Sequence, residues 1–289
     1  MLYATLIAPF AEFEFMRRAL VGILALALGA PPVGVFLMLR RMSLIGDAMA
    51  HAILPGAAIG FLIAGLSLFA MAGAGLIAGF LIAIGAGLIA RATQLKEDAS
   101  LAAFFLISLA LGVTIVSVKG SNIDLLHFLF GSVLAIDDPA LALIAGVTSV
   151  SLVVLALIWR PLVLECVDPG YLHSVSRAGG PAHIAFLALV VMNLVGGFQA
   201  LGTLLAVGVM ILPAVIARFW ARDISAIIGT AIACGAISGY AGLLLSYHAN
   251  LPSGPAIILV AGALYAISVM FGPVGGLIWH ALRRRHLEA

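Results

Sequence analysis

The sequence predicts an all-α polytopic membrane protein with about nine transmembrane helices. Of its 289 residues, 64% are hydrophobic and only 9% are charged, whereas soluble domains carry about 25% charged residues. Apolar stretches recur along the chain, and about 20 apolar residues are enough to cross a bilayer core about 30 Å thick. With so little polar surface, the chain cannot be a conventional soluble globule.

Nine ranges are apolar enough to be membrane spans. They lie near 17–39, 43–65, 67–90, 99–118, 139–158, 183–197, 200–217, 224–247 and 255–279. The stretch 183–217 could also be one long helix, which would give eight spans. With nine spans, two short helices meet at Gly196-Gly197, and Asn193 and Gln199 flank the break and satisfy its freed backbone groups.

The distribution of basic residues favours nine spans. With nine, 11 of the 14 Lys and Arg residues fall on one side of the membrane, and this regularity is lost with eight. The positive-inside rule then places the N-terminus outside and the C-terminus in the cytoplasm. We therefore expect an interfacial segment at 1–16, a single transmembrane domain at 17–280 that includes a loop at 161–181, and a cytoplasmic tail at 281–289.

An outer segment, Lys119 to Pro139, contains an apolar run that is too short to span, which favours a re-entrant or interfacial helix. Its polar residues could form an outer point that attracts cations, and the alternative, which we favour, is that its acids cap short helices. The residues concerned are Asp124, His127, Asp137 and Asp138.

The longest cytoplasmic connection, Pro161 to Pro181, carries the signals of a short helix. Asp168 followed by Pro169 is typical of a helix start, and Gly179-Gly180-Pro181 is a matching stop. Arg177 would lie in the last turn. Docking of a soluble partner is the simplest function for such a helix.

The most informative residues for function are Asp47 and His51, within the apolar stretch MSLIGDAMAHAILPG. Residues at i and i+4 share one face of a helix, and a carboxylate with an imidazole suits zinc, manganese or iron. Ionisable residues at membrane depth are expensive and usually functional; at about 1.5 Å per residue, His51 lies about 15 Å beyond Arg41, near the midplane. Pro55 would free the His51 carbonyl. The structural alternative is a buried pair that hydrogen-bonds to neighbouring helices or to itself.

Other motifs narrow the function. The sequence contains no GxxxxGK[ST] phosphate loop and no HExxH motif, so ATP hydrolysis and zinc-peptidase chemistry are not expected of this chain. Cys166 and Cys234 lack a CxxC spacing, and neither a disulfide framework nor a zinc-thiolate site is indicated. Glycines at four-residue spacing (Gly56/Gly60, Gly75/Gly79, Gly235/Gly239 and Gly272/Gly276) indicate closely packed helices.

The chain resembles the integral-membrane permease of metal-type ABC importers, which bring zinc, manganese or iron into bacteria. The resemblance rests mainly on RRMSLIGDAMAHAILPG (Arg40 to Gly56). DLLHFLFGS (Asp124 to Ser132), the Asp168-Pro169 loop, LLAVGVMILPAVIARF (Leu204 to Phe219) and LPSGPAIILVAGAL (Leu251 to Leu264) support it.

The resemblance implies a homodimer in the bacterial plasma (inner) membrane, two cytoplasmic ATPase subunits and one extracytoplasmic metal-binding protein. It implies that Asp47 and His51 handle the metal, that the helix after Asp168 couples to the ATPase, and that no intrinsic cofactor is needed. Two positions depart from the family pattern: His127 replaces a small or hydroxyl residue, and Gly170 replaces a common acidic one.

We therefore expect a channel-forming permease for zinc or manganese, with iron as the weaker candidate. Two ligands per subunit fall short of the four of a zinc shell, and a dimer would double them. A proton-coupled secondary carrier is one alternative, although no inverted repeat is evident. An ABC permease for a metal chelate or vitamin is another.

Overall fold

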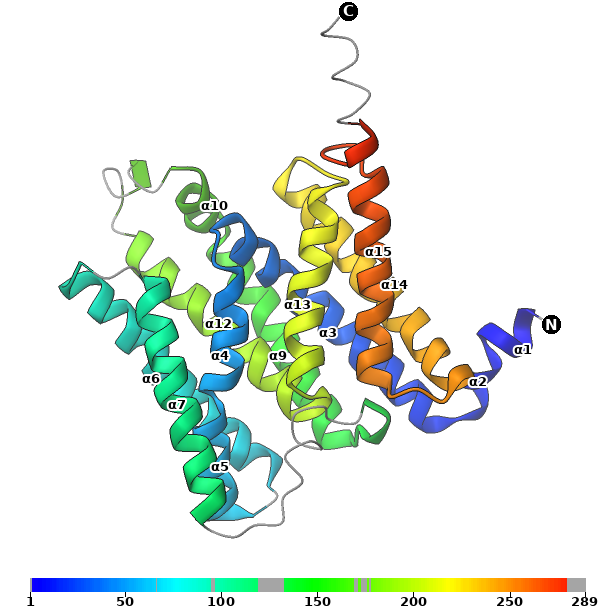
Figure 1. The fold of residues 1–289 in the computed structure, drawn as a ribbon, viewed down its shortest axis with the longest axis horizontal. Coiled ribbons are helices and arrows are strands. Elements are labelled where there is room, and N and C mark those ends of the chain that lie inside the picture. Colours follow the sequence, from blue (N-terminus) through cyan, green and yellow to red (C-terminus); the bar gives the residue numbers. More distant parts are fainter. Residues whose placement is uncertain are drawn as a thin grey trace, which may run out of the picture.

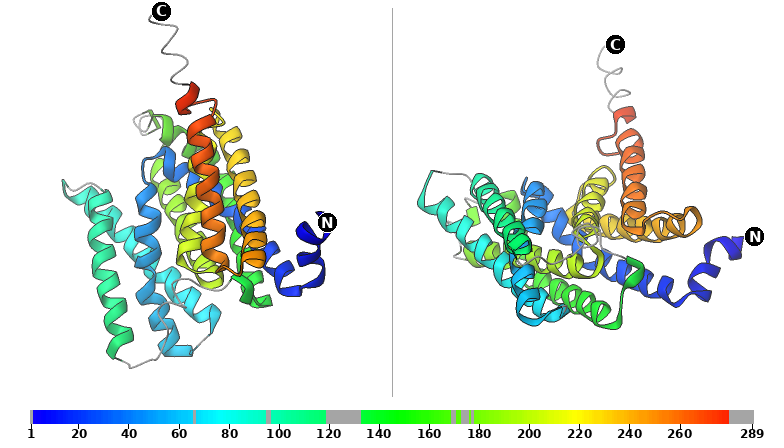
Figure 2. Two further views of the ribbon diagram at one scale, coloured as in Figure 1. Left: turned by 45° about the vertical axis from the view of Figure 1, so that its right-hand side comes forward. Right: turned by 60° about the horizontal axis from the view of Figure 1, so that its bottom comes forward.

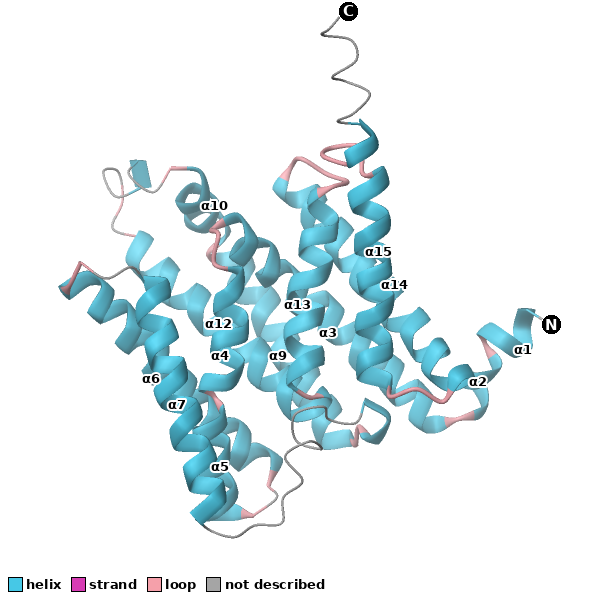
Figure 3. Cartoon of the chain, in the orientation of Figure 1, coloured by secondary structure: helices cyan, strands magenta, loops and turns pink. Residues whose placement is uncertain are grey.

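The structure is a computed structural model that describes residues 2–65, 67–94, 97–118, 133–168, 171–172, 176 and 178–279. All regular elements in these residues are helices (Figures 1 and 3). They are α1 (Leu2–Leu6), α2 (Ala8–Glu12), α3 (Glu14–Leu39), α4 (Ser43–Ala52), α5 (Leu54–Ala64), α6 (Leu68–Ala92), α7 (Glu97–Val118), the 3-10 helix η1 (Val133–Ala135), α9 (Asp138–Leu157), α10 (Trp159–Val167), α12 (Gly179–Leu201), α13 (Thr203–Arg218), α14 (Ile224–Ala249) and α15 (Ser253–Phe271).

The helices confirm an all-α membrane protein with several spans. In the described part of the chain, 7 helical segments are long and apolar enough to cross a membrane, with α4 and the following α5 counted as one segment from Ile45. Two further apolar helices, Ala99–Ile115 within α7 and Thr203–Arg218, are shorter. The count of nine spans and the orientation of the termini stay predictions.

The predicted break at Gly196-Gly197 is wrong. Both glycines lie inside α12, where a Cβ on Gly196 would contact Val147 and one on Gly197 would contact Ala206. The chain breaks instead at Gly202, whose φ of 91° is readily adopted only by glycine. Asn193 does not serve a break either, because its amide donates to Ser151 Oγ at 2.8 Å and to the Leu189 carbonyl at 2.9 Å.

The predicted ends of two further segments shift, and one helix was not predicted. The first long helix begins at Glu14 and not near residue 17, and two short helices, α1 and α2, form the preceding part of the predicted interfacial segment. The last long helix ends at Phe271 and not near residue 279, because Gly272-Pro273 starts a turn in which Gly276 N–H donates to the Gly272 carbonyl. The helix α10 was not predicted at all, since it follows α9 with a single intervening residue.

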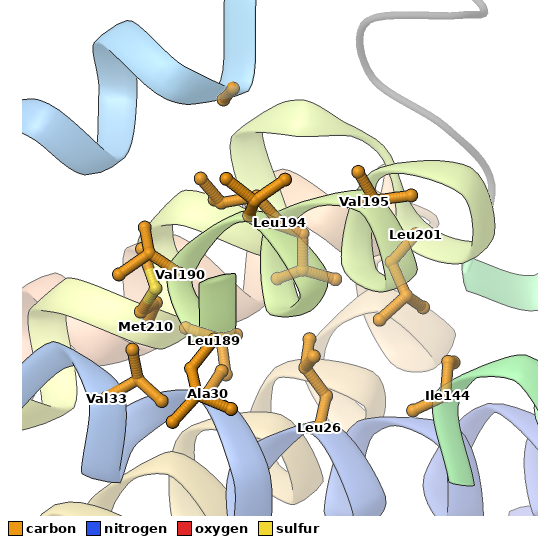
Figure 4. Packing of buried hydrophobic residues seen from close by; sticks show 14 of the residues in the cluster. Leu26, Ala30, Val33, Ile144, Leu189, Val190, Leu194, Val195, Leu201 and Met210 are labelled. Carbon is orange, nitrogen blue, oxygen red and sulfur yellow. The ribbon is translucent and has the colours of Figure 1, made fainter. Parts of the chain in front are cut away.

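The core surrounds α3, which packs against α9, α13 and α14. Leu26, Ala30 and Val33 of α3 face Leu189 and Leu194 of α12, and all five are at most 1% exposed (Figure 4). Helices α6 and α7 lie on one flank of this core, and α14 and α15 lie on the other (Figure 2). Helix α10 and the end of α15 lie at one end of the bundle, and the end of α5 lies at the opposite end (Figure 1).

The four-residue glycine spacing marks close helix packing within the chain. A Cβ on Gly56 or Gly60 of α5 would overlap backbone atoms of α6 near Ala74 and Ala70. Dense packing of small residues, as predicted, therefore explains these glycines. Gly272 and Gly276 differ, because they belong to the turn after α15.

Candidate functional site

Asp47 and His51 lie in α4, which follows α3 after a tight turn. Arg41 adopts a left-handed conformation with φ of 58°, and Met42 N–H donates to the Leu37 carbonyl at 2.8 Å. This turn fixes the start of α4 relative to α3. In the bundle, α4 packs against α7, α12 and α13.

The two side chains lie on one face of α4, as the spacing predicts. His51 Nε2 is 3.9 Å from Asp47 Oδ1, too far for a hydrogen bond. Two metal–ligand bonds of about 2.1 Å span at most about 4.2 Å, so both atoms could bind one ion between them. Side-chain exposure is 65% for Asp47 and 28% for His51. The pair thus offers one oxygen and one nitrogen ligand at an open face.

The imidazole of His51 also packs against α7. Its ring lies 5.6 Å from the Phe105 ring of α7, measured between centroids. His51 Nδ1 is buried and has no hydrogen-bond partner among the described residues. The orientation of the ring therefore comes from packing, and Nε2 is the nitrogen directed toward Asp47.

The helix that carries the pair breaks directly after it. Helix α4 ends at Ala52, and Pro55 lies in the first turn of α5. Pro55 has no N–H to offer the His51 carbonyl, and the Ile53 N–H donates to the Met49 carbonyl at 3.2 Å, so the expectation that the His51 carbonyl is left free stays a prediction. The next carbonyl, that of Ala52, has a side-chain donor, because Ser108 Oγ of α7 donates to it at 2.9 Å.

We expect Ser108→Ala to lower the stability of the protein by about 1–3 kcal/mol, because the substitution leaves a buried carbonyl without a donor. At about 2–4 °C per kcal/mol, the unfolding midpoint in detergent should fall by about 2–12 °C. Ser149→Ala is the matched control, since the exposed Ser149 hydroxyl bonds only to Ala145 O of its own helix. Equal midpoints for the two variants would contradict the assignment.

The described residues of one chain do not complete a metal shell. Among the described residues, no group of three or more His, Cys, Asp or Glu side chains is arranged to hold an ion. The described residues therefore offer two candidate ligands, Asp47 and His51, which is fewer than a complete shell needs.

The predicted outer acids separate into two sets. Asp124 and His127 lie outside the described residues. Asp137 caps α9, where its Oδ1 accepts from Ala140 N–H at 2.9 Å, and this is the capping role that we favoured. Asp138 contacts Arg18 Nη2 at 3.3 Å. An outer cation-attracting role for these acids stays a prediction.

The predicted partner-docking segment is described only in part. Asp168 Oδ1 accepts from Tyr171 N–H at 2.9 Å, which is the hydrogen bond of a helix N-cap. Pro169 and Arg177 lie outside the described residues. A role in docking stays a prediction.

One cluster was missed from the sequence. Arg40, the last residue before the turn into α4, contacts Glu165 of α10 and His183 of α12. Glu165 is the only acid between Pro161 and Val167, but its presence alone does not indicate which distant residues it contacts. His183 lies at the start of a predicted span, where an amphipathic ring is common.

Comparisons with known proteins agree over nearly the whole chain. The model of the ABC 3 transport family matches residues 12–272. The manganese import system permease protein ScaB of Streptococcus parasanguinis is 33% identical over 271 residues, which cover 94% of this chain and 95% of that protein. The manganese transport system membrane protein MntC of Halalkalibacterium halodurans is 30% identical, with 96% and 95% covered.

A solved structure shares the fold. PsaBC from Streptococcus pneumoniae, determined in complex with a Fab, superimposes with a TM-score of 0.85 at 29% identity. The match covers 99% of this chain and 100% of that one.

Proposed function

The chain belongs to the ABC 3 transport family, and from this premise we propose that it is the channel-forming permease of an ATP-driven manganese importer. It is a multi-pass membrane permease of the metal-type ABC importers, as the resemblance implied. The names of the relatives favour manganese over zinc, because ScaB and MntC are both described as manganese proteins. Carboxylate oxygen and imidazole nitrogen are ligands that Mn²⁺ accepts.

The exposure of Asp47 carries this proposal. A carboxylate that is 65% exposed within an apolar span cannot face lipid without a large cost. Water and a second protein surface are the environments that tolerate it. We therefore assign Asp47 and His51 to the translocation path.

A second copy of the chain would complete the site. Related by a two-fold axis, the copies would bring four ligands to one path. Loose coordination suits a transporter, because a tight and saturated site would not release its ion. We therefore propose a homodimer with the metal path at its axis.

The remaining partners follow from the family. We assign ATP hydrolysis to two separate cytoplasmic subunits and metal delivery to an extracytoplasmic binding protein. The segment from Asp168 to Arg177 is our candidate for the ATPase contact. We place the permease in the bacterial plasma membrane, with the ATPase subunits on its cytoplasmic side and the binding protein on its outer side.

The test is uptake in proteoliposomes that contain the permease with its ATPase and binding protein. ATP is supplied on the side of the membrane that carries the ATPase subunits. We expect uptake of radioactive manganese to be at least about tenfold higher with ATP than with a non-hydrolysable ATP analogue. An uncoupled path would instead let the metal gradient dissipate. Parallel vesicles without the ATPase receive a proton gradient. Uptake in those vesicles would refute the proposal in favour of a proton-coupled carrier.

A further inference from the structure

A partly buried ion-pair junction joins three helices at the end of the bundle where α10 lies (Figure 1). Arg40 Nη2 donates to Glu165 Oε1 at 2.9 Å and to His183 Nδ1 at 2.7 Å. The guanidinium only donates, so Nδ1 of His183 is the acceptor and the imidazole proton lies on Nε2. The side chains of Arg40 and Glu165 are 12% and 11% exposed.

Aromatic side chains support the junction. The Arg40 guanidinium lies 5.3 Å from the centre of the Phe186 ring, a cation–π distance. Phe36 contacts Trp159 and Phe186 edge to face, at centroid distances of 5.6 and 6.4 Å. Both the polar contacts of Arg40 and these aromatic contacts therefore join the same three helices, α3, α10 and α12.

The position of the junction links two functional parts of the chain. Helix α10 ends at Val167 and α12 begins at Gly179, so the two helices bracket the candidate ATPase contact. Arg40 itself precedes the tight turn into α4, which begins at Ser43 and carries Asp47 one turn later. A shift of α10 and α12 against α3 would therefore move Arg40 and, with it, the start of α4, the helix that carries Asp47 and His51.

The junction also has unused hydrogen-bonding capacity. Arg40 Nη1 and Glu165 Oε2 are buried and have no partner among the described residues. Arginine and carboxylate usually pair through two parallel hydrogen bonds. The same groups can therefore form a second arrangement, in which Arg40 and Glu165 pair at two points and His183 is released.

We propose that Arg40 is a positioning residue for transport: through Glu165 and His183 it keeps the helix that carries Asp47 in register with the helices that flank the ATPase contact. This inference rests on the proposed function. Packed interfaces rearrange between discrete states, and the junction offers two such states.

The experiment measures manganese uptake and ATP hydrolysis together in the reconstituted complex. Glu165→Gln keeps the shape of the side chain and removes its charge. We expect the amount of manganese transported per ATP to fall about tenfold, within the range typical of coupling between sites. ATP hydrolysis itself should stay within about twofold, because the ATPase subunits are unaltered.

Companion variants separate coupling from mere packing. The double exchange Arg40→Glu with Glu165→Arg should recover part of the amount of manganese transported per ATP. His183→Gln keeps a neutral hydrogen-bond acceptor and should leave this ratio unchanged. His183→Lys places a second cation beside Arg40 and should lower the ratio, even if Glu165→Gln fails to assemble. Arg222→Gln is the control, since Arg222 is exposed in the turn before α14.

Two results would overturn the inference. The first is an unchanged ratio in both Glu165→Gln and His183→Lys. The second is a parallel loss of uptake, hydrolysis and thermal stability in every variant of the junction, which would show a packing role only. Asp47→Ala in the same assay separates the two proposals, because normal uptake by Asp47→Ala would refute the proposed function itself.

Discussion

Asp47→Ala and His51→Ala are each expected to reduce ATP-driven manganese uptake by about a hundredfold or more. In a two-fold dimer, each substitution removes two of the four ligands, and losing even supporting groups of a metal site costs about 10- to 100-fold in affinity or activity. Assembly should survive Asp47→Ala, because the Asp47 side chain is 65% exposed and contributes little to packing. Uptake in vesicles and co-purification with the ATPase are the two measurements.

Conservative variants sharpen this prediction. Asp47→Asn keeps the size of the side chain but loses the charge, and we expect it to behave like Asp47→Ala. Asp223→Ala is the control, since Asp223 is an exposed aspartate at the start of α14 whose side chain makes no cap hydrogen bond. Normal uptake by Asp47→Ala and His51→Ala would refute the site.

The structural alternative for this pair predicts a different outcome. If the carboxylate and imidazole served only to bond neighbours, their loss would lower stability and leave transport per folded complex unchanged. The 3.9 Å separation of Asp47 Oδ1 and His51 Nε2 is too long for a hydrogen bond between the two side chains, so this alternative would need bonds to neighbouring helices. Stability and uptake measured on the same preparation therefore distinguish the two roles.

The helical architecture was readable from the sequence because hydrophobicity directly reports which segments can enter a membrane. The spacing of Asp47 and His51 was equally readable, since it depends only on helix geometry. The break at Gly202 was not, because any glycine tolerates a positive φ and only tertiary packing decides which one adopts it. Gly196 and Gly197 serve instead as contact points for Val147 and Ala206.

The contacts of Arg40 could not be predicted from the sequence for a similar reason. Its partners lie 125 and 143 residues away, and a single sequence carries no signal of such distant pairing. The chain showed a basic residue at a span end, which is what the positive-inside rule predicts. Only the packing of α3, α10 and α12 reveals that this charge is paired and partly buried.

The close crossing of α3 and α13 leads to the other large expected effect. Gly34 of α3 lies against the backbone of Met210 in α13, and a Cβ at this position would overlap the Met210 carbonyl oxygen. A side chain can rotate away from a clash, whereas a helix backbone cannot. Helices in membranes use small residues to reach such proximity.

We therefore expect Gly34→Ala to destabilise the protein by about 3 kcal/mol or more, since the two helices must move apart. The unfolding midpoint in detergent should fall by at least about 6 °C, with a lower yield of monodisperse protein. Gly229→Ala is the matched control: a Cβ at Gly229 meets no atom within 4 Å, and alanine favours a helix by about 1 kcal/mol over glycine. The crossing would be looser than the structure shows if Gly34→Ala matched this control.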